Sequence, residues 1–342
     1  MYQTLKNFSA DQQIAALFVT VFGFLLLASV VTLLLSLREH GDGEFDSAAE
    51  AEVAKRRHND LRNVEGVLKT SWLMALVFWL GWVSGNGVAL LLFGGVSFFA
   101  LREFMTMSPT RRGDHRSLIL AFFVILPLQY WLVGNEHFSL FTVFIPVYVF
   151  LAIPVVSALA NDPHRFLERN AKLQWGIMVC IYGMSHVPAL LLLDFPNYNN
   201  KNAFLVFFLV LVVQICLMMQ HLASRTLRRV PAVPNISQSF NWPSWWIGMA
   251  VGSVLGGLLA GITPFSPGQA FAMAFIACAA GSMGHLVMKA LKRDRGIPIW
   301  RDEQGLRSGV AVTGANGLLE RVDALCFAAP VFFHSVQWYF NL

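Results

Sequence analysis

The sequence predicts an all-α protein, a polytopic bundle of transmembrane helices, and three observations favour this class. Only 13% of the 342 residues are charged and 56% are hydrophobic, whereas soluble domains carry about twice that charged share. Apolar runs of about 20 residues recur along the chain, each long enough to cross a bilayer core of about 30 Å. Because every backbone group in hydrocarbon must be paired within its segment, we expect these runs to be helices. The third observation is the one-sided distribution of the basic residues.

About ten spans are predicted, each bounded by polar or turn residues. The first run, "AALFVTVFGFLLLASVVTLLLSL", is too long for the hydrophobic region of a signal peptide, so no cleavable signal is expected. The second and third runs are separated only by "SGNG", which predicts a tight helical hairpin. The predicted spans cover residues 14–37, 70–84, 87–104, 117–134, 138–159, 173–194, 203–222, 244–262, 268–288 and 324–340.

The basic residues predict the orientation. With the N-terminus outside, all of the 25 Lys and Arg residues except Lys6 and Lys201 fall on the inner side. This asymmetry follows the positive-inside rule. We expect a multi-pass protein of the inner (plasma) membrane. The formal charge of +5 is therefore interpreted as a topology signal and an attraction for anionic lipid, and no nucleic-acid partner is expected.

The first inner loop, residues 38–69, is polar and rich in Ala, Glu, Lys and Arg. It predicts a surface helix, with docking of a partner protein left open. We therefore expect two domains: an N-terminal transmembrane helix with its cytoplasmic loop, residues 1–69, and a transmembrane domain, residues 70–342.

Small residues inside the spans predict packing rather than chemistry. The eighth span, "GMAVGSVLGGLLAG", carries glycines at a spacing of four, which favours close helix contacts. The four cysteines have no CxxC or metal-type spacing, so we expect buried, unreactive side chains.

Polar side chains at membrane depth are costly and often functional. In the sixth span Ser185 and His186 precede Pro188, which removes a helical hydrogen bond. His186 either lines a polar cavity or bonds a neighbouring carbonyl, and the sequence leaves both open. Gln214 is interpreted as a helix-packing contact. The chain has no HExxH, GxSxG, zinc or Walker pattern.

A charged segment separates the last two predicted spans. Its motifs "KRDRG" (292–296) and "GLLERVDAL" (317–325), with the closing "AAPVFFH", resemble the phosphatidate cytidylyltransferase family, also called CDP-diacylglycerol synthases. Upstream, "LFGGVSFFALREF", "NDPHRFL" and "YGMSHVPALLLL" also resemble family segments. The resemblance covers most of the chain after about residue 70.

The resemblance implies a reaction in which CTP and phosphatidate give CDP-diacylglycerol and pyrophosphate. Both reactants are anionic, so divalent ions held by carboxylates would neutralise charge and orient the attack. The implied cofactor is Mg²⁺ or Mn²⁺. The candidate substrate contacts are Lys292, Arg293, Arg321 and His186. The candidate metal ligands, if the protein is active, are Asp323, Glu320 and His285.

The sequence departs from the family pattern where metal ligands are expected. A Ser-Asn-Asp cluster is replaced by Ile215, Cys216 and Leu217, and a Gly-Asp pair by Gly284 and His285. The Ser-Pro-x-Lys-Thr loop becomes 237–241 and loses its lysine. Three further motifs also differ. Pro298 and Ile299 replace Lys-Asp, and Glu320 and Arg321 replace Asp-Arg. After an insertion, Ala315, Asn316 and Gly317 replace His-Gly-Gly.

Three functions stay open. The first is a non-catalytic member that binds an anionic phospholipid such as phosphatidate, or a partner protein or second copy of itself. The second is an active enzyme using CTP and a rebuilt metal site, with Asp302 and Glu303 of the insertion joining His285, Glu320 and Asp323. A histidine ligand would favour Mn²⁺ or Zn²⁺ over Mg²⁺. The third is a lipid transporter with a polar cavity near His186, although no inverted repeat is visible.

Overall fold

The structure is a computed structural model. It describes residues 10–39, 84–107, 110–195, 198, 201–227, 229–295 and 317–340, together with residues 68, 72, 76, 79 and 80. Within these ranges the chain is almost entirely helical, and the β-type pairing is an isolated bridge between Val233 and Ser237. The all-α prediction is confirmed for this part of the chain.

The chain divides into two compact units, Met1–Ala89 and Leu90–Leu342. In the first unit, helix α2 spans Ala10–Glu39. Its Ser29 hydroxyl donates to the carbonyl of Leu25 (2.7 Å) and accepts from Trp72 Nε1 (3.0 Å). The Trp72 ring also stacks on Phe22, with ring centroids 5.6 Å apart. Trp72 is thus packed against α2. Most of the predicted 38–69 loop lies outside the described residues. The predicted domain boundary at residue 69 therefore stays a prediction.

The second unit is a series of long helices, some of which contain π-helical or 3₁₀ turns. Each π-helical turn contains a proline or is followed by one within a few residues, as expected where a backbone donor is missing. The elements are α4 (Asn86–Met107), α5 (His115–Leu120), α6 (Leu126–Gly134), α7 (Phe138–Val143), α8 (Phe150–Ala158), α9 (Phe166–Gly176), α10 (Met184–Ala189), α11 (Ala203–Leu227), α12 (Trp242–Leu258), α13 (Pro267–Asp294) and α14 (Leu318–Phe340).

Seven continuous helices in the described residues are long and apolar enough to cross a membrane. They coincide with the third to ninth predicted spans. The first predicted span falls on α2 and the tenth on α14, and both are helical but are not among the seven. The second predicted span lies mostly outside the described residues, so the count of ten and the outward N-terminus stay predictions. The seven are Asn86–Met107, Arg112–Gly134, Phe138–Ala158, Phe166–Leu192, Ala203–Leu227, Trp242–Ile262 and Pro267–Asp294.

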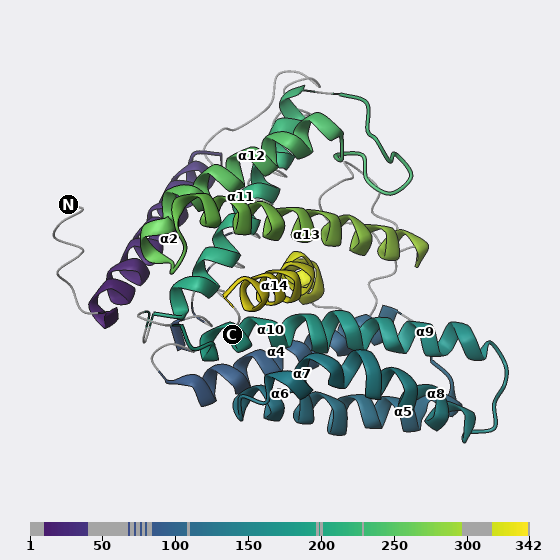
Figure 1. The fold of residues 1–342 in the computed structure, drawn as a ribbon. Helices are drawn as coiled ribbons and strands as arrows, with labels where there is room; N and C mark the ends of the chain where they lie inside the picture. The colour runs from purple at the N-terminus through teal and green to yellow at the C-terminus, as the bar shows by residue number, and fades with distance from the viewer. Residues whose placement is uncertain are drawn as a thin grey trace, which may run out of the picture. The chain divides into compact units, whose positions relative to one another are not determined.

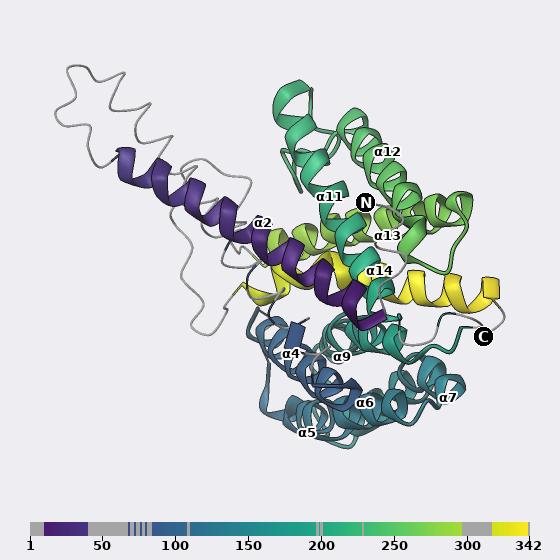
Figure 2. The same cartoon turned by 90° about the vertical axis from the view of Figure 1, so that its left-hand side faces the viewer.

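Helix α14 lies between two groups of helices in the second unit. It contacts α13 and α11 on one side, and α10 with the π-helical turn Ile177–Gly183 on the other (Figures 1 and 2). Glycines allow both approaches: a Cβ at Gly284 would overlap the Phe327 ring, and one at Gly183 would overlap the Cys326 carbonyl. The N-terminal turn of α14 is bonded to Glu103 of α4 and to Lys292 of α13.

The glycines of α12 face neighbouring helices, as the spacing predicted. A Cβ at Gly248 would lie 2.7 Å from the Cys216 carbonyl oxygen, and one at Gly252 would lie 2.6 Å from the Cys278 sulfur. The predicted burial of the cysteines is also confirmed, because all four are buried free thiols. Residues at the position of the family's Ser-Asn-Asp cluster thus pack against α12.

Candidate site at the charged end of α13 and α14

Helix α13 carries the first part of the site and has clear sequence signals at both ends. It begins with a capping box, in which Gln269 Oε1 accepts from the backbone N–H of Ser266, followed by Pro267 in the first turn. It ends in a turn that holds Lys292 and Arg293, whose charges suit the negative end of the helix dipole. The apolar helix therefore delivers basic side chains to one end.

Lys292 forms an ion pair with Glu320 from the first turn of α14. The Nζ–Oε2 distance is 2.7 Å, and the two side chains are only 7% and 17% exposed. Removing one partner of a buried ion pair typically destabilises the fold by about 3–5 kcal/mol, because the other charge is left unpaired away from water. This pair therefore joins the ends of the two helices across the charged segment.

His285 and Asp323 form the second link between these helices. His285 Nδ1 lies 2.8 Å from Asp323 Oδ2, and the Asp323 side chain is 4% exposed. An ionised carboxylate only accepts, so the Nδ1–H donates and the imidazole is held in one tautomer. Asp323 Oδ1 also accepts from the backbone N–H of Ala324. Both oxygens of Asp323 therefore have partners within the chain.

A buried glutamate from a distant helix caps α14. One oxygen of Glu103, on α4, accepts from the backbone N–H groups of Leu318 (2.8 Å) and Leu319 (3.1 Å). These are among the donors that an α-helix leaves unpaired at its start, and a negative charge there is favourable. Glu103 is not among the residues predicted from the sequence, although a lone glutamate in the apolar run "FFALREF" was the available signal.

The loop between α11 and α12 meets α13 beside this cluster. Lys289 Nζ lies 3.4 Å from Ser237 Oγ and 3.5 Å from Ser239 Oγ, and the two hydroxyl oxygens are 3.2 Å apart. From the sequence, Lys289 was predicted only to lie on the inner side of the membrane. We call Glu103, His285, Lys289, Lys292, Glu320 and Asp323, with Ser237 and Ser239, the charged-end cluster.

Comparison with known proteins identifies the scaffold that carries this cluster. The sequence model of the Cytidylyltransferase family matches residues 66–339, which include every member of the cluster. The chain belongs to the cytidylyltransferase family. It is also 29% identical over 323 residues to the Escherichia coli (strain K12) protein named "Uncharacterized protein YnbB", covering 93% of this chain and 97% of that protein. The apolar helices together with this family indicate a membrane protein.

The cytidylyltransferase reaction would need carboxylates available for divalent ions, and the described donors fit this need poorly. Of the candidate ligands, Asp323 is held by His285 and Glu320 by Lys292. Among the residues that the structure describes, no group of three or more His, Cys, Asp or Glu side chains is placed to hold an ion. Asp302 and Glu303, which the rebuilt-site hypothesis requires, lie outside the described residues, as do positions 298, 299, 315 and 316.

The remaining predicted substrate contacts are divided between two places. Arg293 lies in the last turn of α13, and Arg321 is half-buried beside Glu320 on α14. His186 is instead fully buried against the Phe333 and His334 rings, ten or more residues further along α14 than Asp323. At 1.5 Å per residue this is about 15 Å from the cluster along the helix axis.

The His186 environment consists mainly of ring and backbone contacts. The residue shares a turn with Ser185, and its Nδ1 lies 2.7 Å from the Tyr182 carbonyl oxygen. The Ser185 hydroxyl donates to the same carbonyl, and Gln129 Nε2 donates to that hydroxyl at 3.2 Å. Of the two interpretations offered by the sequence, this geometry favours a histidine that bonds a neighbouring carbonyl.

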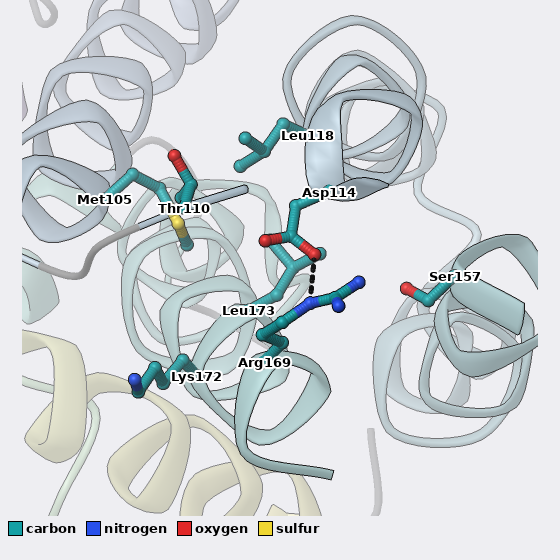
Figure 3. A pocket seen from close by; sticks show the side chains of 8 residues that line it. All are labelled: Met105, Thr110, Asp114, Leu118, Ser157, Arg169, Lys172 and Leu173. Atoms are coloured by element: carbon teal, nitrogen blue, oxygen red, sulfur yellow. Dashed lines mark hydrogen bonds and ion pairs between the residues drawn. The ribbon is translucent and has the colours of Figure 1, made fainter. Parts of the chain in front are cut away.

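A second buried ionic group lies in the family segment "NDPHRFL" and its neighbours. Arg169 on α9 donates from Nε to Asp114 Oδ1 at 2.7 Å, and its Nη1 lies 2.8 Å from Asp162 Oδ2. The Arg169 and Asp114 side chains point toward each other in a small pocket, which Ser157 and Lys172 also line (Figure 3). Because one guanidinium contacts both carboxylates, this group joins the ends of α5, α8 and α9.

Proposed function

We propose that the chain is a non-catalytic membrane member of the cytidylyltransferase family that binds an anionic phospholipid headgroup at the charged-end cluster. One observation carries this proposal: each carboxylate at the start of α14 is already paired, Asp323 with His285 and Glu320 with Lys292. The protein is further proposed to reside in the inner (plasma) membrane with its N-terminus outside and this cluster at the cytoplasmic face.

The paired carboxylates argue against the family's metal chemistry. Mg²⁺ is usually bound through one or two carboxylates together with substrate phosphates and water. Recruiting Glu320 would leave the Lys292 ammonium, which is only 7% exposed, without that partner. Breaking a buried pair costs about 3–5 kcal/mol, which the ion would have to offset. Position 285 supplies an imidazole where the family pattern has a carboxylate, so one negative charge is absent from the donor set.

The charge that remains suits an anion. The end of α13 and the start of α14, residues 285–295 and 317–325, hold five basic side chains and three acidic ones. Two of the three acidic side chains, Glu320 and Asp323, are already paired within the chain. Ammonium and guanidinium groups at the membrane surface attract anionic lipid with about 1 kcal/mol per residue. A phosphate headgroup is therefore the expected ligand class, and the chemistry requires no bound metal.

Turnover and binding must be measured separately. Purified full-length protein in detergent is incubated with CTP, phosphatidate and Mg²⁺ or Mn²⁺, and CDP-diacylglycerol and pyrophosphate are quantified. We expect no product above that of the Asp323→Asn variant. Co-flotation with phosphatidate-containing liposomes should exceed co-flotation with phosphatidylcholine liposomes. Equal recovery with both lipids would contradict headgroup binding and leave a protein partner as the next occupant to test.

An active enzyme with a rebuilt site is the second candidate, because the His285–Asp323 hydrogen bond has a second interpretation. Carboxylates commonly orient a metal-binding histidine by accepting from its other nitrogen. In that case His285 Nε2, with carboxylates of the insertion, would hold a softer ion such as Mn²⁺ or Zn²⁺. This candidate predicts product formation that requires metal and is lost in both His285→Ala and Asp323→Asn.

A further inference from the structure

Lys289 brings an ammonium group to the loop from which the family's own lysine is missing. The residue is buried, with 9% of its surface exposed, and lies one turn before Lys292 on α13. Its Nζ is within 3.5 Å of the hydroxyls of both Ser237 and Ser239. Those serines occupy the Ser-Pro-x-Lys-Thr position, where this chain has Phe240 in place of the lysine.

The loop that carries the serines is held in one shape by its own hydrogen bonds. The Ser237 N–H donates to the Val233 carbonyl (2.9 Å), and the Ala232 N–H donates to the Phe240 carbonyl (2.8 Å). Asn241 then caps α12 by accepting from the Ser244 N–H at 2.9 Å. A loop fixed in this way presents its hydroxyls without an ordering cost on binding.

One ammonium and two hydroxyls are suited to the oxygens of a phosphate group. Lysine binds phosphate as a compact charge with three donors, and each serine hydroxyl can rotate to donate. The two serine oxygens lie 3.2 Å apart, so both can reach neighbouring oxygens of one phosphate. The arrangement therefore offers several donors to a single tetrahedral anion.

The surroundings place this group at the depth of lipid headgroups. Trp242 and Trp246 at the start of α12 are each 56% exposed, and tryptophans gather where a membrane meets water. The Phe240 ring packs against Trp242, with centroids 5.6 Å apart. Phe240 thus stands at the lysine position of the motif and makes an aromatic contact, while the positive charge beside the loop comes from Lys289 on α13.

We propose that Lys289, Ser237 and Ser239 form a binding site for a phosphate monoester, with the lysine supplied by α13 instead of by the loop. This inference rests on the proposed headgroup binding and names the residues that perform it. The same chemistry would accept the phosphate of phosphatidate or free inorganic phosphate, so the test must distinguish the two.

The test uses the full chain in detergent micelles and measures binding by calorimetry. The probes are dioctanoyl phosphatidate, dioctanoyl phosphatidylcholine and inorganic phosphate. We expect Lys289→Gln, and separately the Ser237→Ala/Ser239→Ala double variant, to weaken phosphatidate binding by about tenfold or more. Arg225→Gln removes one exposed positive charge at the end of α11, beside the same loop, and should leave the affinity within about twofold.

Each outcome decides one question. The site is supported if the wild-type protein binds both phosphate probes but not phosphatidylcholine, and if both variants lose this binding. The phosphate probe that binds more tightly then identifies the ligand as phosphatidate or as free phosphate. Unchanged affinity in Lys289→Gln and in the serine double variant overturns the site while headgroup binding elsewhere stands. If the wild-type protein binds neither phosphate probe, the proposed function and this inference both fail. The double variant decides alone if Lys289→Gln does not fold.

Discussion

His285 Nδ1 on α13 lies 2.8 Å from Asp323 Oδ2 on α14, at a position where the family resemblance implied a carboxylate in place of the histidine. An imidazole that donates to a carboxylate holds two helices together without any cation.

The His285–Asp323 hydrogen bond should stabilise the fold rather than support turnover. Asp323→Asn keeps the shape of the side chain but removes its charge, and a hydrogen bond to a charged group contributes about 1.5–3 kcal/mol. We expect a lower melting temperature in detergent. His285→Ala should lower it similarly, and the double variant should be less unstable than the sum of the two. Strict additivity would show that the contact is not formed in solution.

The Lys292–Glu320 pair should show the asymmetry of a buried ion pair. Lys292→Met leaves the Glu320 carboxylate, 17% exposed, without its partner, and we expect a loss of about 3–5 kcal/mol in the free energy of unfolding. Lys292→Met combined with Glu320→Leu removes both charges and should recover much of that loss. The readout is the midpoint of denaturant unfolding. A double variant as unstable as Lys292→Met would argue against the pair.

Glu103 should protect the first backbone amides of α14. Glu103→Ala removes the carboxylate oxygen that accepts from the backbone N–H groups of Leu318 and Leu319. Loss of a helix cap typically costs about 1 kcal/mol, so amide exchange there should speed up by about fivefold. Hydrogen exchange with mass spectrometry measures peptides from the start of α14, with peptides from α12 as the internal control. Unchanged exchange in the α14 peptides would contradict the capping role.

Gly284 should tolerate no side chain, whereas Gly268 on the same helix should. A Cβ at Gly284 would overlap Phe327, and nothing lies within 4 Å of a Cβ built at Gly268. We expect Gly284→Ala to lower the melting temperature by several degrees because overpacking typically costs about 1–3 kcal/mol. Gly268→Ala should leave it unchanged or raise it slightly. Equal effects of the two would show that α13 and α14 are not in this close contact.

The fold was largely predictable because its signals are local. Apolar runs of sufficient length predicted the third to ninth spans, and the spacing of Gly248 and Gly252 predicted the packing of α12. Helix α14 was predicted as a span from 324, yet the helix begins at Leu318, because Glu103 accepts from its first amides. That stabilising residue comes from 215 positions away in the chain, and no local pattern encodes it.

The site was predicted in its residues but not in their pairing. The resemblance singled out His285, Glu320 and Asp323 as candidate metal ligands, whereas the structure pairs two of them with each other and the third with Lys292. Pairing depends on which faces of two helices meet, which a single sequence does not specify. Lys289 was missed for the same reason, since its serine partners lie about 50 residues away.

The central claim is that the cluster lacks the free negative oxygen needed for cytidylyl transfer. The most direct measurement is the rate of CDP-diacylglycerol formation by the purified wild-type protein with CTP, phosphatidate and Mg²⁺ or Mn²⁺, compared with Asp323→Asn under the same conditions. The account predicts no product above background for either protein. Metal-dependent product from the wild type that disappears in Asp323→Asn would contradict it.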